Sequence, residues 1–81
     1  MIVLNDLFTV KTWTGEVKPV KKIVLFPEID QSGDIFYKIE GQLNLDYFMI
    51  YYSYNHIEAK EKYLTLLDEL IEYQIKSLQE N

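Results

Sequence analysis

The last third of the chain, residues 55–79, most constrains the fold, because it predicts one long amphipathic helix. Asn55 is a suitable N-cap, since its side-chain oxygen can accept a hydrogen bond from a backbone N–H of the first turn. Glu58 lies three residues later and completes the pattern of a capping box. No glycine or proline interrupts the segment before Gln79.

The apolar side of this helix is wider than a single core requires. Its apolar residues cover an arc of roughly 200°, whereas a surface helix needs somewhat more than about 100°. One seam is spaced by seven residues and consists of Ile57, Leu64, Ile71 and Leu78. Lys60 and Gln74 fall where the alternate apolar residues of a coiled coil would be. We therefore expect a helix that lies on a sheet and has one flank in a subunit interface.

Four strands are predicted before the helix, over residues 7–13, 20–27, 35–40 and 46–54. Pro19 cannot donate within a central strand, so the second strand begins at or after Val20 or lies at an edge. The apolar run Ile23 to Phe26 predicts burial on both faces of that strand. Turns are expected at 14–16 and 30–34, and a turn or a bulge at 41–44. The predicted fold is a single α+β domain over 1–81, a four-stranded antiparallel β-meander followed by one long C-terminal amphipathic helix packed on the sheet (ββββα).

The last predicted strand is rich in aromatic residues. Strict alternation places Phe48, Ile50, Tyr52 and Tyr54 on one face and Tyr47, Met49, Tyr51 and Ser53 on the other. Because the helix can cover only one of these faces, the second face is expected to be open to a partner. Tyrosine suits a protein interface, since it combines a large contact area with a polar tip.

Length and composition also point to association. A chain of 81 residues buries only about 60–65% of its unfolded surface. Domains of this size are only marginally stable unless a disulfide, a metal or association with another chain stabilises them. The chain has no cysteine, which excludes disulfides and zinc–thiolate sites. With 48% hydrophobic residues, the chain is predicted to form a homodimer.

The charge is acidic overall but uneven. The net charge is −5, yet residues 1–22 carry four lysines against two acids. An acidic balance disfavours general nucleic-acid binding, although a local lysine group can contact phosphate. The alternative function is therefore a nucleic-acid-binding module, or a site for an acidic partner, formed by Lys11, Trp13, Lys18, Lys21 and Lys22.

No pattern in the sequence predicts catalysis, a cofactor or a metal site. Asp30, Ser32 and Asp34 resemble a calcium loop only faintly, because Gly33 is at the fourth position and Gly41 at the twelfth, where an acid is needed. His56 is the only histidine and lies at the expected start of the helix. We predict that the chain is not an enzyme and has no cofactor.

The provenance and location are predicted from weaker features. Met1 to Asp6 has no basic segment typical of a signal peptide, and no stretch reaches the roughly 18 apolar residues of a membrane span. There is no arginine, and residues with A/T-rich codons are common. These features predict a cytoplasmic protein, located in the host cytoplasm if it is a viral or mobile-element accessory factor.

The function predicted from these features is a non-enzymatic, homodimeric protein-interaction module that binds or inhibits a host protein. The candidate core and interface residues are Phe48, Ile50, Tyr52, Tyr54, Tyr63, Leu66, Leu70 and Tyr73. The sequence does not decide which of them form the core. A third possibility is a small-molecule pocket at the dimer interface.

Overall fold

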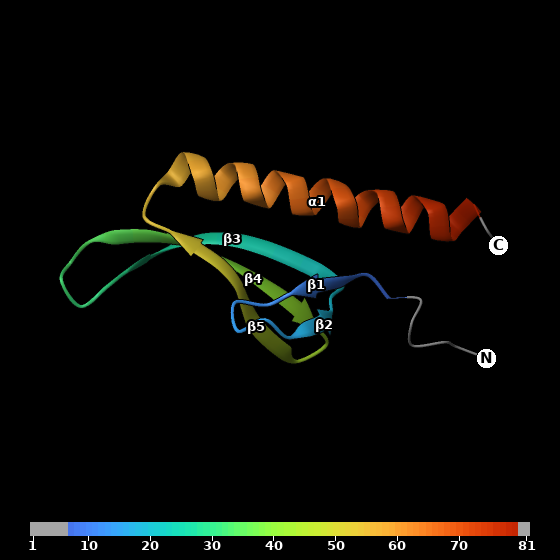
Figure 1. Cartoon of the computed structure of the whole chain (residues 1–81), viewed down its shortest axis with the longest axis horizontal. Coiled ribbons are helices and arrows are strands. Elements are labelled where there is room, and N and C mark those ends of the chain that lie inside the picture. Colours follow the sequence, from blue (N-terminus) through green and yellow to red (C-terminus); the bar gives the residue numbers. More distant parts are fainter. Residues whose placement is uncertain (1–6, 80–81) are drawn as a thin grey trace.

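Three consecutive strands form an antiparallel sheet in the computed structural model, which describes residues 7–79 (Figure 1). They are β3 (Lys22–Ile29), β4 (Ile35–Leu43) and β5 (Asp46–Ser53), in the order β3-β4-β5. The predicted turn at 30–34 connects β3 to β4, and Gly33 adopts a φ of 87° there. Asn44, with a φ of 56°, turns the chain between β4 and β5.

The first half of the predicted meander differs from the expectation. Two short strands, β1 (Thr9–Lys11) and β2 (Val17–Pro19), form a separate antiparallel hairpin. Pro19 therefore lies in a strand that pairs on one side only. The α+β class with one C-terminal helix is confirmed, but residues 7–79 form five strands in two sheets, because residues 17–19, just before the predicted second strand, form β2 and pair with β1 instead of joining the larger sheet.

Backbone hydrogen bonds hold this hairpin against the larger sheet. The Trp13 N–H donates to the carbonyl of Met49 in β5 at 3.0 Å. The Lys21 N–H donates to the carbonyl of Gln42 in β4 at 2.9 Å. The hairpin thus contacts both β4 and β5, and its turn places Trp13 beside β5.

The helix α1 (His56–Gln79) begins as predicted. The N–H groups of Ile57 and Glu58 donate to Asn55 Oδ1 at 2.9 and 3.2 Å. The capping box differs in one bond, because Glu58 accepts a hydrogen bond from the Ser53 hydroxyl at 3.2 Å. Ser53 Oγ in turn accepts from the Asn55 N–H at 3.0 Å, so the serine links the glutamate to the cap.

The core lies between α1 and one face of the sheet. Its buried members are Val10, Val20, Ile23, Ile39, Ile50, Leu66 and Leu70. Ile39 is fully buried and Val20 retains 1% exposure. The predicted burial of Ile23 to Phe26 on both faces is wrong, because only Ile23 is buried. Val24 and Phe26 are half-buried, since α1 packs on one face of β3, β4 and β5 and leaves the opposite face open (Figure 1). Leu25 is also half-buried, although it lies on the core face beside Ile39 and packs against the core.

Gly41 lies inside β4 and not in a turn, contrary to the prediction for 41–44. An added Cβ at this position would lie 2.7 Å from Phe48 Cε2 and 2.8 Å from Val20 Cγ1. This glycine is therefore required by close packing between β4, β5 and the hairpin, and not by backbone conformation.

A β-bulge at Ile50 divides the aromatic strand. Tyr51 pairs with Ile39 and Met49 pairs with Glu40, so Ile50 is the extra residue on β5. Ile50 is buried, and Tyr51 packs against the core from the same side as Ile39. The predicted row of Phe48, Ile50, Tyr52 and Tyr54 on one face is consequently wrong, since Tyr52 lies on the side away from Tyr51.

Within residues 7–79, no helix is long and apolar enough to cross a membrane. The prediction about a signal peptide concerns residues 1–6, which lie outside the described residues.

Candidate interaction surfaces

The outer side of α1 carries a row of exposed apolar residues, interrupted by Lys60, Glu61 and Asp68. Its members are Ile57, Leu64, Ile71, Ile75 and Leu78, with exposed fractions of 57%, 45%, 44%, 48% and 75%. At about 100° per residue, they lie opposite the buried residues Ala59, Leu66 and Leu70. We call these five residues the outer stripe. It includes the whole seven-residue seam predicted from the sequence, and it extends from the first to the last turn of the helix.

The charges along α1 are unequal in its two halves. Residues 56–67 carry two glutamates and two lysines, so their net charge is zero. Residues 68–79 carry three acids, Asp68, Glu69 and Glu72, and one lysine, Lys76, so their net charge is −2. Any helix pairing that superimposes the two C-terminal halves would therefore place like charges together.

A second uncovered surface is the sheet face opposite α1. The strand register places Phe26, Lys38 and Tyr52 side by side across β3, β4 and β5. Glu28 pairs with Phe36 in the neighbouring row of the same face, and Val24 pairs with Glu40 in the row on the other side. These residues remain half-buried, because no element of residues 7–79 covers them as α1 covers the core face.

Aromatic rings form a connected cluster on this face. Trp13 and Tyr52 have ring centroids 4.7 Å apart, and Phe36 lies 5.8 Å from Tyr52. Tyr54 is 5.6 Å from Phe36 and 6.4 Å from Tyr52. Trp13 and Tyr54 retain 51% and 54% exposure, so the two ends of the cluster are open to solvent. We call Trp13, Phe26, Phe36, Tyr52 and Tyr54 the aromatic face.

Lys38 lies within the aromatic face and is surrounded by carboxylates. Its Nζ is 3.7 Å from Glu28 Oε1 and 3.7 Å from Glu40 Oε2. The same ammonium lies 5.8 Å from the centroid of the Phe26 ring, which is within the range of a cation–π interaction.

Asp30 borders the aromatic face at the β3–β4 turn. Its Oδ2 accepts a hydrogen bond from the Tyr54 hydroxyl at 2.7 Å, and its Oδ1 accepts from the N–H groups of Ser32 and Asp34, both at 2.9 Å. The Tyr54 hydrogen bond, with the backbone bonds, lowers the pKa of Asp30 below its ordinary value. The same bond raises the pKa of Tyr54, because it stabilises the protonated hydroxyl. Asp30 is therefore a fixed anion at neutral pH.

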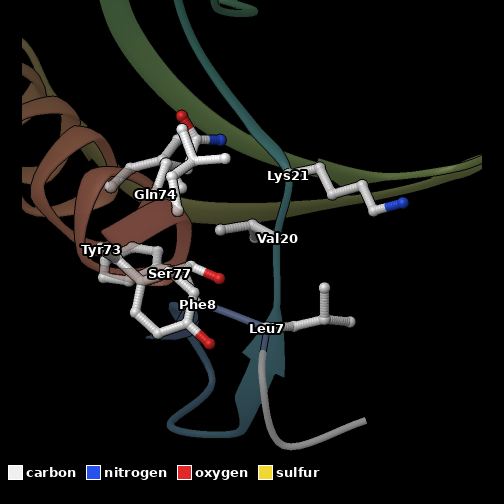
Figure 2. Close-up of a pocket in the computed structure, with 9 residues that line it drawn as sticks. Leu7, Phe8, Val20, Lys21, Tyr73, Gln74 and Ser77 are labelled. Atoms are coloured by element: carbon white, nitrogen blue, oxygen red, sulfur yellow. The ribbon is translucent and has the colours of Figure 1, made fainter. Parts of the chain in front are cut away.

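An open apolar pocket of about 470 Å³ lies between the N-terminal segment and the last turns of α1 (Figure 2). Phe8 and Tyr73 line it with their ring centroids 5.8 Å apart. Figure 2 shows Val20 pointing toward the helix and Lys21 pointing away from it. Leu78 belongs both to this pocket and to the outer stripe, so the two surfaces are continuous.

The lysines proposed for nucleic acid do not form one group. Lys18 Nζ lies 3.7 Å from Glu16 and 5.4 Å from the centroid of the Phe48 ring, so it is already engaged. Lys11 pairs with Val17 and Lys18 with Val10, which places the two lysines on opposite faces of the hairpin. Lys21 and Lys22 are exposed at the start of β3. Trp13 shares a small hollow with Lys18 but contacts the aromatic face through Tyr52.

His56 and the acidic turn have local structural contacts. The His56 ring lies 5.9 Å from that of Tyr37, at the first turn of α1. Within residues 7–79, no three histidine, aspartate or glutamate side chains converge in a way that could hold a metal ion. The Asp30 carboxylate is used by Tyr54 and the turn backbone, which fits the predicted hairpin turn.

The predicted interface residues separate into three groups. Ile50, Leu66 and Leu70 are buried, and Phe48 and Tyr63 pack against that core while retaining partial exposure. Tyr73 packs on Phe8, whereas Tyr52 and Tyr54 belong to the aromatic face. Sequence reasoning missed Phe36 on that face, although the alternation of β4 was a signal for it. It also named no outer-stripe residue among the interface candidates, although the seven-residue seam was a signal for four of the five.

Comparisons of the chain with protein-family models, with curated proteins and with solved structures found no match. Function is therefore inferred from the residues of this chain and their geometry.

Proposed function

We propose that this protein is a non-enzymatic protein-interaction module that forms a homodimer through the outer stripe of α1. The observation that carries the proposal is the outer stripe, a row of five aliphatic side chains that are 44–75% exposed. The row runs along the whole helix, on the side away from the core. A stripe of this length is unusual on a lone surface helix, where the side opposite the core is polar.

The free energy available at the outer stripe favours association. Full burial of a leucine or isoleucine side chain contributes about 1.5–3 kcal/mol. Because each stripe residue has lost about half of its exposure already, covering all five would contribute about 5 kcal/mol per protomer, or about 10 kcal/mol per dimer. A contribution of this size supports a pair that dissociates on dilution.

Charge favours an antiparallel pair of helices. In a parallel pair, the two C-terminal halves of α1, each with a net charge of −2, would lie side by side. Lys60 would also face its own copy. In an antiparallel pair, each acidic half meets a neutral half, and the helix dipoles are opposed. The pair then has a two-fold axis near the middle of the helix, between Leu67 and Asp68.

The nucleic-acid alternative has less support. It needs a cationic groove beside the aromatic rings. Beside the rings, the sheet face opposite α1 instead carries Glu28, Asp30 and Glu40 against Lys38, and its only other lysine is Lys22 at the far end of β3. Lys11 and Lys18 lie on opposite faces of the hairpin. Association with protein, either a second copy or a host target that the module blocks, agrees better with this arrangement.

Solution mass tests the proposal. Light scattering on a size-exclusion column is expected to give a dimer at high protein concentration and a falling mean mass on dilution, because the interface is small. A single monomer mass of 9.7 kDa across the whole range would contradict it. A flat titration with a short oligonucleotide at low salt would remove the nucleic-acid alternative.

A further inference from the structure

We propose that the aromatic face binds a peptide segment bearing arginine or lysine side chains. This inference rests on the proposed role as an interaction module, but it concerns the sheet face opposite α1 and does not depend on self-association. The occupant is identified by two features that coincide on the face: exposed aromatic rings and a surplus of fixed carboxylates.

The rings provide surfaces for cations. Trp13 and Tyr54 are half-exposed, and the tilted or edge-on packing of the cluster leaves parts of the ring faces free. The negative face of a tryptophan or tyrosine ring attracts a guanidinium or ammonium group, and arginine also stacks on such rings. Buried aromatic packing alone would not leave the two end rings half-exposed.

The carboxylates provide the matching charge. Around the rings, Glu28, Asp30 and Glu40 carry three negative charges against one from Lys38. Lys22, at the far end of β3 on the same face, reduces the net charge of the whole face to −1. Asp30 is oriented by three hydrogen bonds and remains ionised at neutral pH, because the Tyr54 hydroxyl and two backbone N–H groups stabilise its anion. A neutral or acidic segment would desolvate the surplus negative charge of the face without adding a cation to balance it.

Lys38 shows, within the chain itself, how a cation is accommodated on this face. Its ammonium lies over Phe26 and 3.7 Å from each of Glu28 and Glu40. Next to it, the Phe36 and Tyr54 rings lie beside the Asp30 carboxylate, without a lysine between them. An arginine or lysine of the partner would bind there as Lys38 does, over a ring and close to a carboxylate.

Trp13 is the only tryptophan, so its fluorescence reports directly on the aromatic face. The test is a titration with a short peptide in which arginine alternates with serine, and with the same peptide carrying neutral citrulline in place of arginine. The arginine peptide is expected to change the fluorescence saturably, with at least about tenfold tighter binding than the citrulline peptide. Equal binding of the two peptides, or no saturable change with either, would overturn the proposal.

Two variants localise the effect. Asp30→Asn keeps an oxygen for the turn but removes the charge, and Tyr54→Leu removes one ring; each is expected to weaken arginine-peptide binding about fivefold. Glu69→Gln, on the exposed side of α1, changes the net charge by the same amount and is expected to leave binding unchanged. If Glu69→Gln weakened binding as much as Asp30→Asn, attraction to the overall charge would explain the result and the proposed site would be wrong.

Three further outcomes separate this inference from the proposed function. The double variant Leu64→Glu and Ile71→Glu is expected to lose self-association and still bind the arginine peptide. If peptide binding fails while the protein dimerises, the aromatic face proposal fails alone. A fluorescence change that follows protein concentration without peptide would mean that a second copy occupies the aromatic face, which also contradicts the proposal.

Discussion

Replacing Leu64 and Ile71 with glutamate is expected to convert the proposed dimer into a folded monomer. Both side chains lie in the middle of the outer stripe and are 45% and 44% exposed. In a monomer the glutamate carboxylates reach water, so the free energy of unfolding should fall by only about 1 kcal/mol per site, the contribution of the half of each apolar side chain that is already covered. In the dimer they would be desolvated against the partner stripe, and the dissociation constant should rise at least about a hundredfold. Solution mass and the circular dichroism signal measure the two effects separately.

Thr65→Glu is the matched control for Leu64→Glu. It adds the same charge one residue along α1, at an exposed position on the polar side of the helix. We expect it to leave the dimer intact. If Thr65→Glu dissociated the dimer as effectively as Leu64→Glu, the helix charge and not the outer stripe would control association. A double glutamate variant that kept the dimer mass would remove α1 from the interface.

Gly41→Val is expected to destabilise the fold by about 3 kcal/mol or more. The first added carbon would lie 2.7 Å from Phe48 and 2.8 Å from Val20, so the strand, the hairpin or both must move. For a domain of 81 residues with a total stability of roughly 4–12 kcal/mol, this loss is a large fraction. Urea unfolding followed by circular dichroism measures it.

The reverse result would be informative, because valine is ordinarily favoured over glycine in a strand. A Gly41→Val protein as stable as the original would show that the close approach of Phe48 and Val20 is wrong. The paired variant Gly41→Ala with Phe48→Leu tests the same contact, since a smaller side chain at position 48 should recover part of the stability lost in Gly41→Ala alone.

The periodicity of apolar residues in the sequence predicted the helix α1 and the strands β3, β4 and β5. The N-cap at Asn55 and the turn at 30–34 were predictable, because each depends on residues close together in the sequence. The separate β1–β2 hairpin was not predictable in this way. Its position depends on hydrogen bonds from Trp13 to Met49 and from Lys21 to Gln42, which join residues far apart in the sequence. Such long-range bonds leave no periodic signal in the sequence.

Gly41 and Ile50 illustrate why the candidate surfaces were only partly predicted. Glycine usually indicates a turn, but at Gly41 it permits close packing that involves residues from three elements. The bulge at Ile50 moved Tyr52 and Tyr54 away from the core face, and strict alternation could not anticipate it. The outer stripe was visible as a surplus of apolar residues, but only the packing of Leu66 and Leu70 identified which part of the arc was surplus.

The distance between spin labels on the two copies of α1 tests the antiparallel homodimer most directly. The chain has no cysteine, so Glu69→Cys and Lys76→Cys each provide a single attachment site on the same side of the helix, clear of the outer stripe. Seven residues of helix span about 10.5 Å, so in an antiparallel pair the axial separation of labels at position 76 exceeds that at position 69 by about 20 Å. Pulsed electron paramagnetic resonance should then give a distance at position 76 that is longer by at least about 10 Å. Equal distances at both positions, or no dipolar coupling at concentrations where the protein is fully folded, would contradict the account.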